Sequence, residues 1–109
     1  MYDYKTYLYD IIECINRIEE YTHNMDYNKF VSFKMAQDAV VRNLEVIGEA
    51  VKKLPDEVKS KECSIEWRKI AGFRDILIHD YANIDQEIVW DVLQNKLPEL
   101  KRAVKNLLE

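Results

Sequence analysis

The chain contains very little glycine and proline. Its 109 residues include only two of each, against average usages of about 7% and 5%. Small sheet-rich domains need many such turn residues, so their scarcity argues against a β-sandwich or a β-barrel. We therefore expect a few long helices. The length fits a single domain over residues 1–109, whose small core would gain from burial in a dimer.

Cysteines are also few, and long apolar runs are absent. Cys14 and Cys63 are too few for a disulfide scaffold and lack metal-ligand spacing. Cys14 falls on the apolar stripe of the first predicted helix, which favours a buried, reduced thiol. Charged residues interrupt every apolar run, so we expect neither a secretory signal nor a membrane-spanning segment. A cytoplasmic protein without a metal or cofactor is the simplest interpretation.

The chain lacks a basic excess. It carries 16 basic and 20 acidic side chains, for a formal net charge of −4. Proteins that bind nucleic acid over a broad surface are usually basic. A locally basic segment, residues 67–74, does contain Arg68, Lys69 and Arg74 without an acid. The sequence therefore disfavours broad binding to nucleic acid but allows a focused site.

Apolar residues recur at steps of three and four along four stretches, which is the period of an amphipathic helix. Asp26 and Asp85 are candidate N-caps, and Pro55 ends the second stretch. Residues 55–64 form a polar connector with room for one helical turn. This pattern predicts an all-α fold, an antiparallel bundle of four to five helices. The predicted helices span about residues 3–22, 26–54, 65–78 and 85–107.

Two residues interrupt these predicted helices. Gly48 lies inside the second one, where glycine costs about 1 kcal/mol relative to alanine. Close approach of another helix is the usual compensation. Pro98 lies inside the last one, where it removes an intrahelical hydrogen bond and predicts a kink.

Residues 74–81 place an arginine, one of the two histidines and a tyrosine within eight positions. Arginine binds phosphate through a bidentate fork, and histidine transfers protons near neutral pH. Together they could cleave a phosphodiester without a metal ion. On one regular helix, however, Arg74 and His79 would point about 140° apart. We therefore expect the helix to end close to His79, or the long arginine side chain to wrap round to it.

Other polar residues could complete such a site. Asp75 precedes His79 by four positions, where its carboxylate could fix the imidazole tautomer. A solvated acid beside a solvated histidine fits equally well. Along the second predicted helix, three side chains on one face could border a cleft or form surface ion pairs: Arg42, Glu45 and Glu49.

The pattern R-x4-H-x-Y, met by Arg74, His79 and Tyr81, is similar to the signature of the HEPN superfamily. Within that superfamily the chain resembles the HepT toxins of HepT–MntA toxin–antitoxin modules. The resemblance spans most of the chain, through residues 38–50, 67–75 and 84–90.

This resemblance implies a HEPN-like helical bundle that forms homodimers, with both copies of the motif lining one interfacial cleft. It also implies a metal-independent endoribonuclease in which Arg74 and His79 are catalytic and Asp75 is supporting. Tyr81 matches the tyrosine to which an ATP-using nucleotidyltransferase antitoxin, related to MntA, attaches AMP. That modification would silence the toxin.

One histidine per motif is an independent reason to expect a dimer. Metal-free RNA cleavage needs a base for the proton of the ribose 2′-hydroxyl and an acid for the departing 5′-oxygen. Two protomers supply two histidines, together with two arginines for the charged phosphorane. The expected product ends in a 2′,3′-cyclic phosphate.

Other interpretations remain open. Arg74 could bind phosphate in a non-catalytic nucleotide-binding or antitoxin-docking module, or the chain could be a dimeric helical scaffold. The pair His79-Asp80 also occurs in metal phosphohydrolases. Those enzymes need further histidines and only His23 remains, so we expect no metal site.

Overall fold

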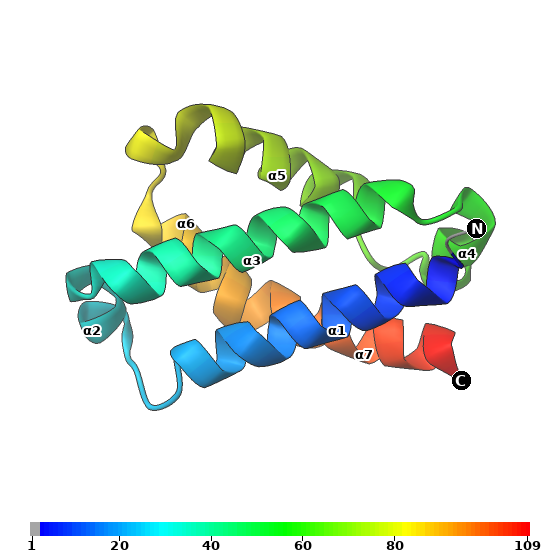
Figure 1. Ribbon diagram of the computed structural model, residues 1–109, viewed down its shortest axis with the longest axis horizontal. Helices are drawn as coiled ribbons and strands as arrows, with labels where there is room; N and C mark the ends of the chain where they lie inside the picture. Colours follow the sequence, from blue (N-terminus) through cyan, green and yellow to red (C-terminus); the bar gives the residue numbers. More distant parts are fainter. Residues whose placement is uncertain (1–2) are drawn as a thin grey trace.

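The computed structural model describes residues 3–109, and the regular elements in this range are all helical (Figure 1). The longer helices are α1 (Tyr4–Tyr21), α3 (Lys34–Lys53), α5 (Trp67–Asp80) and α7 (Leu97–Leu108). The shorter elements are α2 (Tyr27–Ser32), α4 (Asp56–Lys59), η1 (Ser60–Glu62), η2 (Tyr81–Asn83), α6 (Gln86–Asp91) and η3 (Val92–Lys96). The predicted all-α class is confirmed. Within residues 3–109 the helices outnumber the four to five predicted, because two predicted helices are each divided.

Helix α3 lies at the centre of the bundle. It packs against α1 on one side and against α5 on the other, and α1 also packs against α7. Figure 1 shows that α1 and α5 both run antiparallel to α3. Helix α5 is attached to the bundle mainly through α3, so the segment with the arginine and histidine lies along one edge of the molecule.

The apolar periodicity of the sequence corresponds to the buried face of each long helix. In α1 the buried side chains are Leu8, Ile11, Cys14, Ile15 and Ile18. The prediction of a buried Cys14 thiol is confirmed, and burial raises its pKa. Among the described helices, none combines the length and the apolar character needed to cross a membrane.

The second predicted helix is divided into α2 and α3, so the prediction of one continuous helix was wrong. Asp26 caps α2 as predicted. Phe33 then adopts an extended ψ of 89°, which ends α2. The buried side-chain amide of Gln37 donates to the carbonyl oxygens of Phe30 and Val31, both at 2.8 Å. Because these bonds satisfy the end of α2, the chain can bend without interrupting the apolar period.

The last predicted helix is divided as well. Asp85 caps α6 as predicted, accepting the N–H of Glu87 at 2.9 Å. A π-helical stretch, Val92–Lys96, separates α6 from α7, and Pro98 lies in the first turn of α7. Figure 1 shows that the chain changes direction between α6 and α7. The predicted kink is therefore present, and it takes the form of a wider helical turn before the proline.

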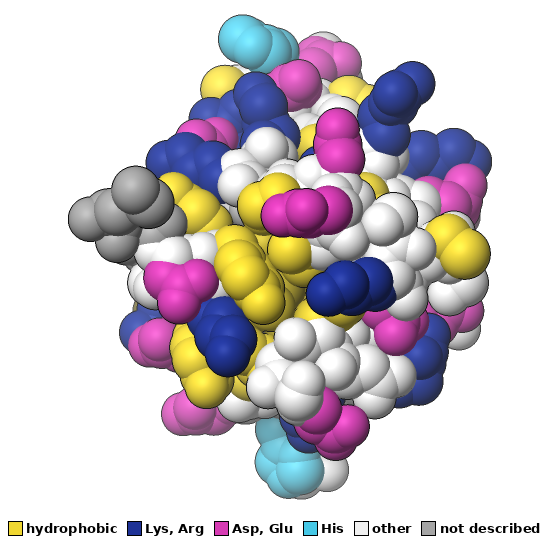
Figure 2. Space-filling view, turned by 90° about the vertical axis from the view of Figure 1, so that its right-hand side faces the viewer, with side chains coloured by type: hydrophobic (Ala, Val, Ile, Leu, Met, Phe, Trp, Pro, Cys, Tyr) yellow, Lys and Arg dark blue, Asp and Glu magenta, His cyan; other side chains and the backbone are white. Residues whose placement is uncertain are grey.

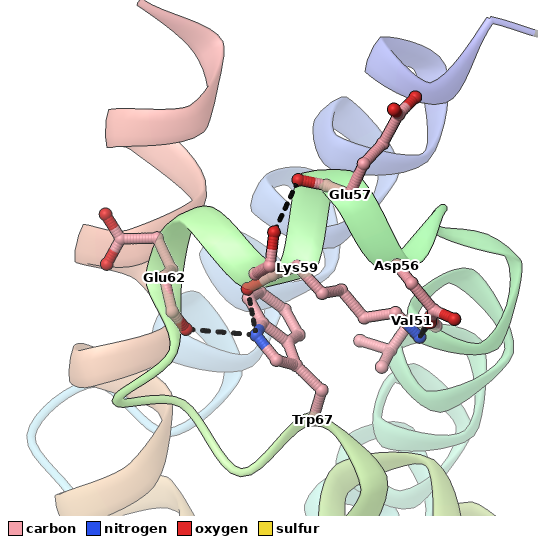
Figure 3. A network of polar contacts seen from close by, with 7 residues as sticks. Val51, Asp56, Glu57, Lys59, Glu62 and Trp67 are labelled. Atoms are coloured by element: carbon pink, nitrogen blue, oxygen red, sulfur yellow. Dashed lines mark hydrogen bonds and ion pairs between the residues drawn. The ribbon is translucent and has the colours of Figure 1, made fainter.

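Trp67, the first residue of α5, anchors that helix to the connector formed by α4 and η1. Its indole Nε1 donates to the carbonyl oxygens of Lys59 and Glu62, both at 3.1 Å (Figure 3). The Lys59 ammonium in turn lies 3.5 Å from the carbonyl oxygen of Val51 and 3.8 Å from the carboxylate of Asp56. These contacts join the start of α5 to the end of α3.

Gly48 marks the closest approach of α5 to α3. A Cβ built on Gly48 would overlap the Cβ of Arg74 and would lie 3.3 Å from its Cγ. The close helix approach predicted from this glycine is therefore confirmed. Gly72 faces away from the bundle, and its Cβ would meet no atom within 4 Å.

The two glycines give a matched test of this helix contact. Gly48→Ala should push α5 away from α3 and lower the free energy of unfolding by about 1–3 kcal/mol, as overpacking typically does. Gly72→Ala, also inside a helix but in open space, should raise it by about 0.5–1 kcal/mol. Chemical denaturation measures both values. Equal stability of the two variants would show that the helices do not meet at Gly48.

Candidate active site

Helix α5 carries the arginine and histidine of the R-x4-H-x-Y motif, and Tyr81 begins η2. The helix remains regular through His79 and ends at Asp80, whose φ of −143° and ψ of 33° leave the helical region. Its end is thus one residue beyond His79, close to the predicted position. Because the helix includes both residues, the side chains of Arg74 and His79 diverge by about 140° around its axis. Within one chain the two groups do not converge.

Arg74 is held between two carboxylates. Its Nε lies 3.1 Å from Oε2 of Glu49 on α3, and its Nη1 donates to Oδ1 of Asp75 at 3.1 Å. The side chain is 25% exposed. Nη2 makes no hydrogen bond with any residue from 3 to 109. Its N–H groups are therefore available to donate to an oxyanion such as a phosphate.

Asp75 contacts Arg74 in this structure, although its spacing also places it beside His79. Its Oδ1 accepts the hydrogen bond from the guanidinium. His79 is exposed, and its imidazole has no hydrogen-bond partner within the described chain. The histidine is therefore free to face solvent or a second molecule.

Tyr81 is joined to the start of α3 by a short hydrogen bond. Its Oη donates to Oδ1 of Asp38 at 2.6 Å, across 43 positions of sequence. Burial, together with the hydrogen bond and the charge of Asp38, raises the pKa of Tyr81 to about 12. Tyr81 as a whole residue is nevertheless 36% exposed.

Asp38 is a site residue that the sequence analysis missed. The available signal was spacing: Asp38 precedes Glu45 by seven and Glu49 by eleven positions. On a helix, each interval returns the side chain to within about 20° of the same direction. A carboxylate two turns before Glu45 on the predicted cleft face was therefore a candidate.

The three residues predicted to line a cleft differ in their contacts. Glu49 pairs with Arg74 and lies 3.6 Å from the ammonium of Lys53. Glu45 is partly exposed on the same face of α3. Arg42 is exposed, and its charge is one of those that partly offset the rise in the pKa of the Cys14 thiol caused by burial. Glu49 is thus the residue of this set that contacts the motif.

On the end of the molecule shown in Figure 2, basic and acidic side chains are interspersed around a hydrophobic patch, and the two histidines project from opposite edges. Residues 3–109 contain no group of three or more His, Cys, Asp or Glu side chains placed to hold a metal ion. Within the motif the strong cation is Arg74, flanked by Glu49 and Asp75.

The raised pKa of Tyr81 predicts a pH-dependent contribution to stability. Folding favours the neutral phenol, so this contribution is fully present below the ordinary tyrosine pKa of 10 and is lost as the pH rises toward about 12. Across this range the native chain should lose stability more steeply than a Tyr81→Phe variant. Denaturant unfolding at successive pH values measures the two slopes. Identical slopes would mean that the phenol does not titrate differently in the folded state.

Comparisons with known proteins agree with the family resemblance of the sequence. A family model described as "Ribonuclease HepT-like" matches residues 11–107. A Methanocaldococcus jannaschii protein named "Putative RNase MJ1216" is 42% identical over 107 residues, covering 98% of this chain and 88% of the relative. "Probable ribonuclease HepT" from Thermococcus cleftensis is 40% identical over 104 residues, covering 95% and 94%. No solved structure shows a significant match.

Proposed function

Since the chain belongs to the ribonuclease HepT-like family, we propose that it is a metal-independent endoribonuclease toxin whose active site is shared by two protomers. The observation that carries this proposal is the clamped guanidinium of Arg74. Glu49 pairs with its Nε and Asp75 with its Nη1, and Nη2 has no partner among the described residues. An arginine held in this way can bind the phosphate of RNA, and it need not reorganise when negative charge develops in the transition state.

The proposed reaction is an internal transfer within RNA. The ribose 2′-oxygen forms a bond to phosphorus as the bond from phosphorus to the 5′-oxygen breaks. One imidazole takes the 2′-hydroxyl proton, and a second, protonated imidazole supplies a proton to the 5′-oxygen. Arg74 stabilises the charged phosphorane, and the product ends in a 2′,3′-cyclic phosphate. His79 of each protomer provides one imidazole.

The outer face of α5 supports a dimer. Gly72, Ile76 and His79 follow one another at steps of four and three, so they share a face of the helix. Ile76 is 52% exposed, and Gly72 has open space above it. A second copy packed against this face would cover the isoleucine. It would also bring the histidine of the second copy close to His79, so that one cleft holds two imidazoles, which one chain cannot supply.

Tyr81 is the proposed point of control. An ATP-using nucleotidyltransferase antitoxin related to MntA would transfer AMP to its hydroxyl. The adenylate would place a bulky anion on the segment that follows His79. In that position it would compete with the RNA phosphate for Arg74.

The catalytic proposal is tested by RNA cleavage in EDTA. The purified protein should cleave RNA and leave 2′,3′-cyclic phosphate ends, identified by mass spectrometry. His79→Ala should slow cleavage by at least about 100-fold, the lower range of a general acid–base contribution. His23→Ala, which removes the other exposed histidine, is the matched control and should cleave at the native rate. Circular dichroism checks the folding of both variants.

Several outcomes would count against this proposal. Strict dependence on Mg²⁺ would contradict metal independence, and cleavage by a protein that remains monomeric would contradict the shared site. A thermal shift with AMP that disappears in Arg74→Ala, without RNA cleavage, would favour a nucleotide-binding module instead.

Control through Tyr81 is tested by Tyr81→Phe. This variant should retain RNA cleavage, because the hydroxyl has no part in the transfer, and should lose about 0.5–1.5 kcal/mol of stability with its hydrogen bond. Incubation with ATP and the nucleotidyltransferase should silence the native chain and leave the variant active. If the variant is silenced as well, the modified residue lies elsewhere.

A further inference from the structure

A tyrosine that receives a nucleotide must give up its phenolic proton. In this structure the proton already points at an acceptor, since Oη of Tyr81 lies 2.6 Å from Oδ1 of Asp38. The two residues come from different elements, η2 and α3, so the contact depends on the packing of the bundle. Asp38 and Tyr81 both lie at the surface of the molecule.

The same contact fixes the position of the hydroxyl. Two links tie the motif to α3: Arg74 to Glu49, and Tyr81 to Asp38. Helix α5 runs antiparallel to α3. Arg74, the earlier motif residue, therefore pairs with Glu49, the later acid on α3, and Tyr81 pairs with Asp38, the earlier one. The hydroxyl of Tyr81 is therefore held in one place relative to Arg74.

We infer that Asp38 positions Tyr81 and accepts its proton during nucleotide transfer. This inference rests on the proposed modification of Tyr81. In the transfer, Oη forms a bond to the α-phosphorus of ATP, and the bond from that phosphorus to the bridging oxygen breaks. The phenolic proton passes to the Asp38 carboxylate, and pyrophosphate leaves with the electron pair of the broken bond.

Nucleotide transfer would also break the hydrogen bond between Tyr81 and Asp38. The esterified oxygen of Tyr81 has no hydrogen to donate, and the phosphodiester anion repels the Asp38 carboxylate at short range. The link between η2 and α3 would then be lost. Silencing would thus combine an added anion with release of the segment that follows His79.

Asp38→Asn separates proton acceptance from anchoring. The asparagine side chain keeps an oxygen that can accept the Tyr81 hydrogen bond, but a neutral amide does not take the proton. If Asp38 only anchors the segment, Asn should serve almost as well. If it accepts the proton, the reactivity of Tyr81 should fall. Glu20→Gln, which neutralises an exposed carboxylate on α1, is the matched control.

The experiment measures the reactivity of Tyr81 without any antitoxin. The full chain is treated with an adenosine derivative that carries an aryl sulfonyl fluoride, and each tyrosine is quantified by peptide mass spectrometry. Tyr9, which is 60% exposed, is the internal reference. At neutral pH, Asp38→Asn should slow labelling of Tyr81 relative to Tyr9 by at least about tenfold, within what general-base assistance supplies. The Glu20→Gln protein should label like the native one.

The pH dependence separates base assistance from a structural effect. As the pH rises toward about 12, the pKa of Tyr81 in the native protein, a base is no longer needed to remove the proton, and the rates for the native protein and Asp38→Asn should converge. Equal labelling at neutral pH, or a native Tyr81 that labels more slowly than Tyr9, would overturn the inference. These results do not depend on RNA cleavage, so failure of the nuclease proposal and failure of this inference are distinguishable.

Discussion

The contact between α3 and α5 at Gly48 is the constraint on which the rest of the site depends. Only a residue without a Cβ allows the backbone of α3 to approach Cβ of Arg74 this closely. The approach brings the guanidinium within reach of Glu49, one position further along α3. A bulkier residue at position 48 would separate the two helices and with them the ion pair. Gly48 thus lowers the helix propensity of α3, but it allows the close approach that positions Arg74.

This arrangement also bears on how an acidic protein could hold the proposed phosphate site. The net charge is −4, and the face of α3 beside the motif carries Asp38, Glu45 and Glu49. These carboxylates do not simply repel an anion, because Glu49 orients the guanidinium of Arg74 and Asp38 holds the hydroxyl of Tyr81. The proposed site therefore relies on one guanidinium, that of Arg74, whose Nη2 has no partner among the described residues.

Sequence periodicity predicted the buried faces of the helices well and their boundaries less well. The N-caps at Asp26 and Asp85 and the break before Pro98 follow from local chemistry, and all are present. The bend at Phe33 was missed because the apolar period runs through it. Its stability depends on Gln37, whose amide satisfies the end of α2 from the following helix. In the sequence, nothing distinguishes Gln37 from any other polar residue of a helix, so its role in capping α2 could not be predicted.

The sequence alone determined the helical class and the presence of an arginine, a histidine and a tyrosine within eight positions. It also determined that Arg74 and His79 diverge on a regular helix, because the rise and turn of an α-helix do not depend on its surroundings. The tertiary structure decided which acids these residues meet. Glu49 and Asp38 lie far from the motif in sequence, and their contacts depend on how α5 is rotated and seated on α3. That seating depends on the close approach at Gly48 and on Trp67 at the start of the helix, and packing across the whole bundle sets both.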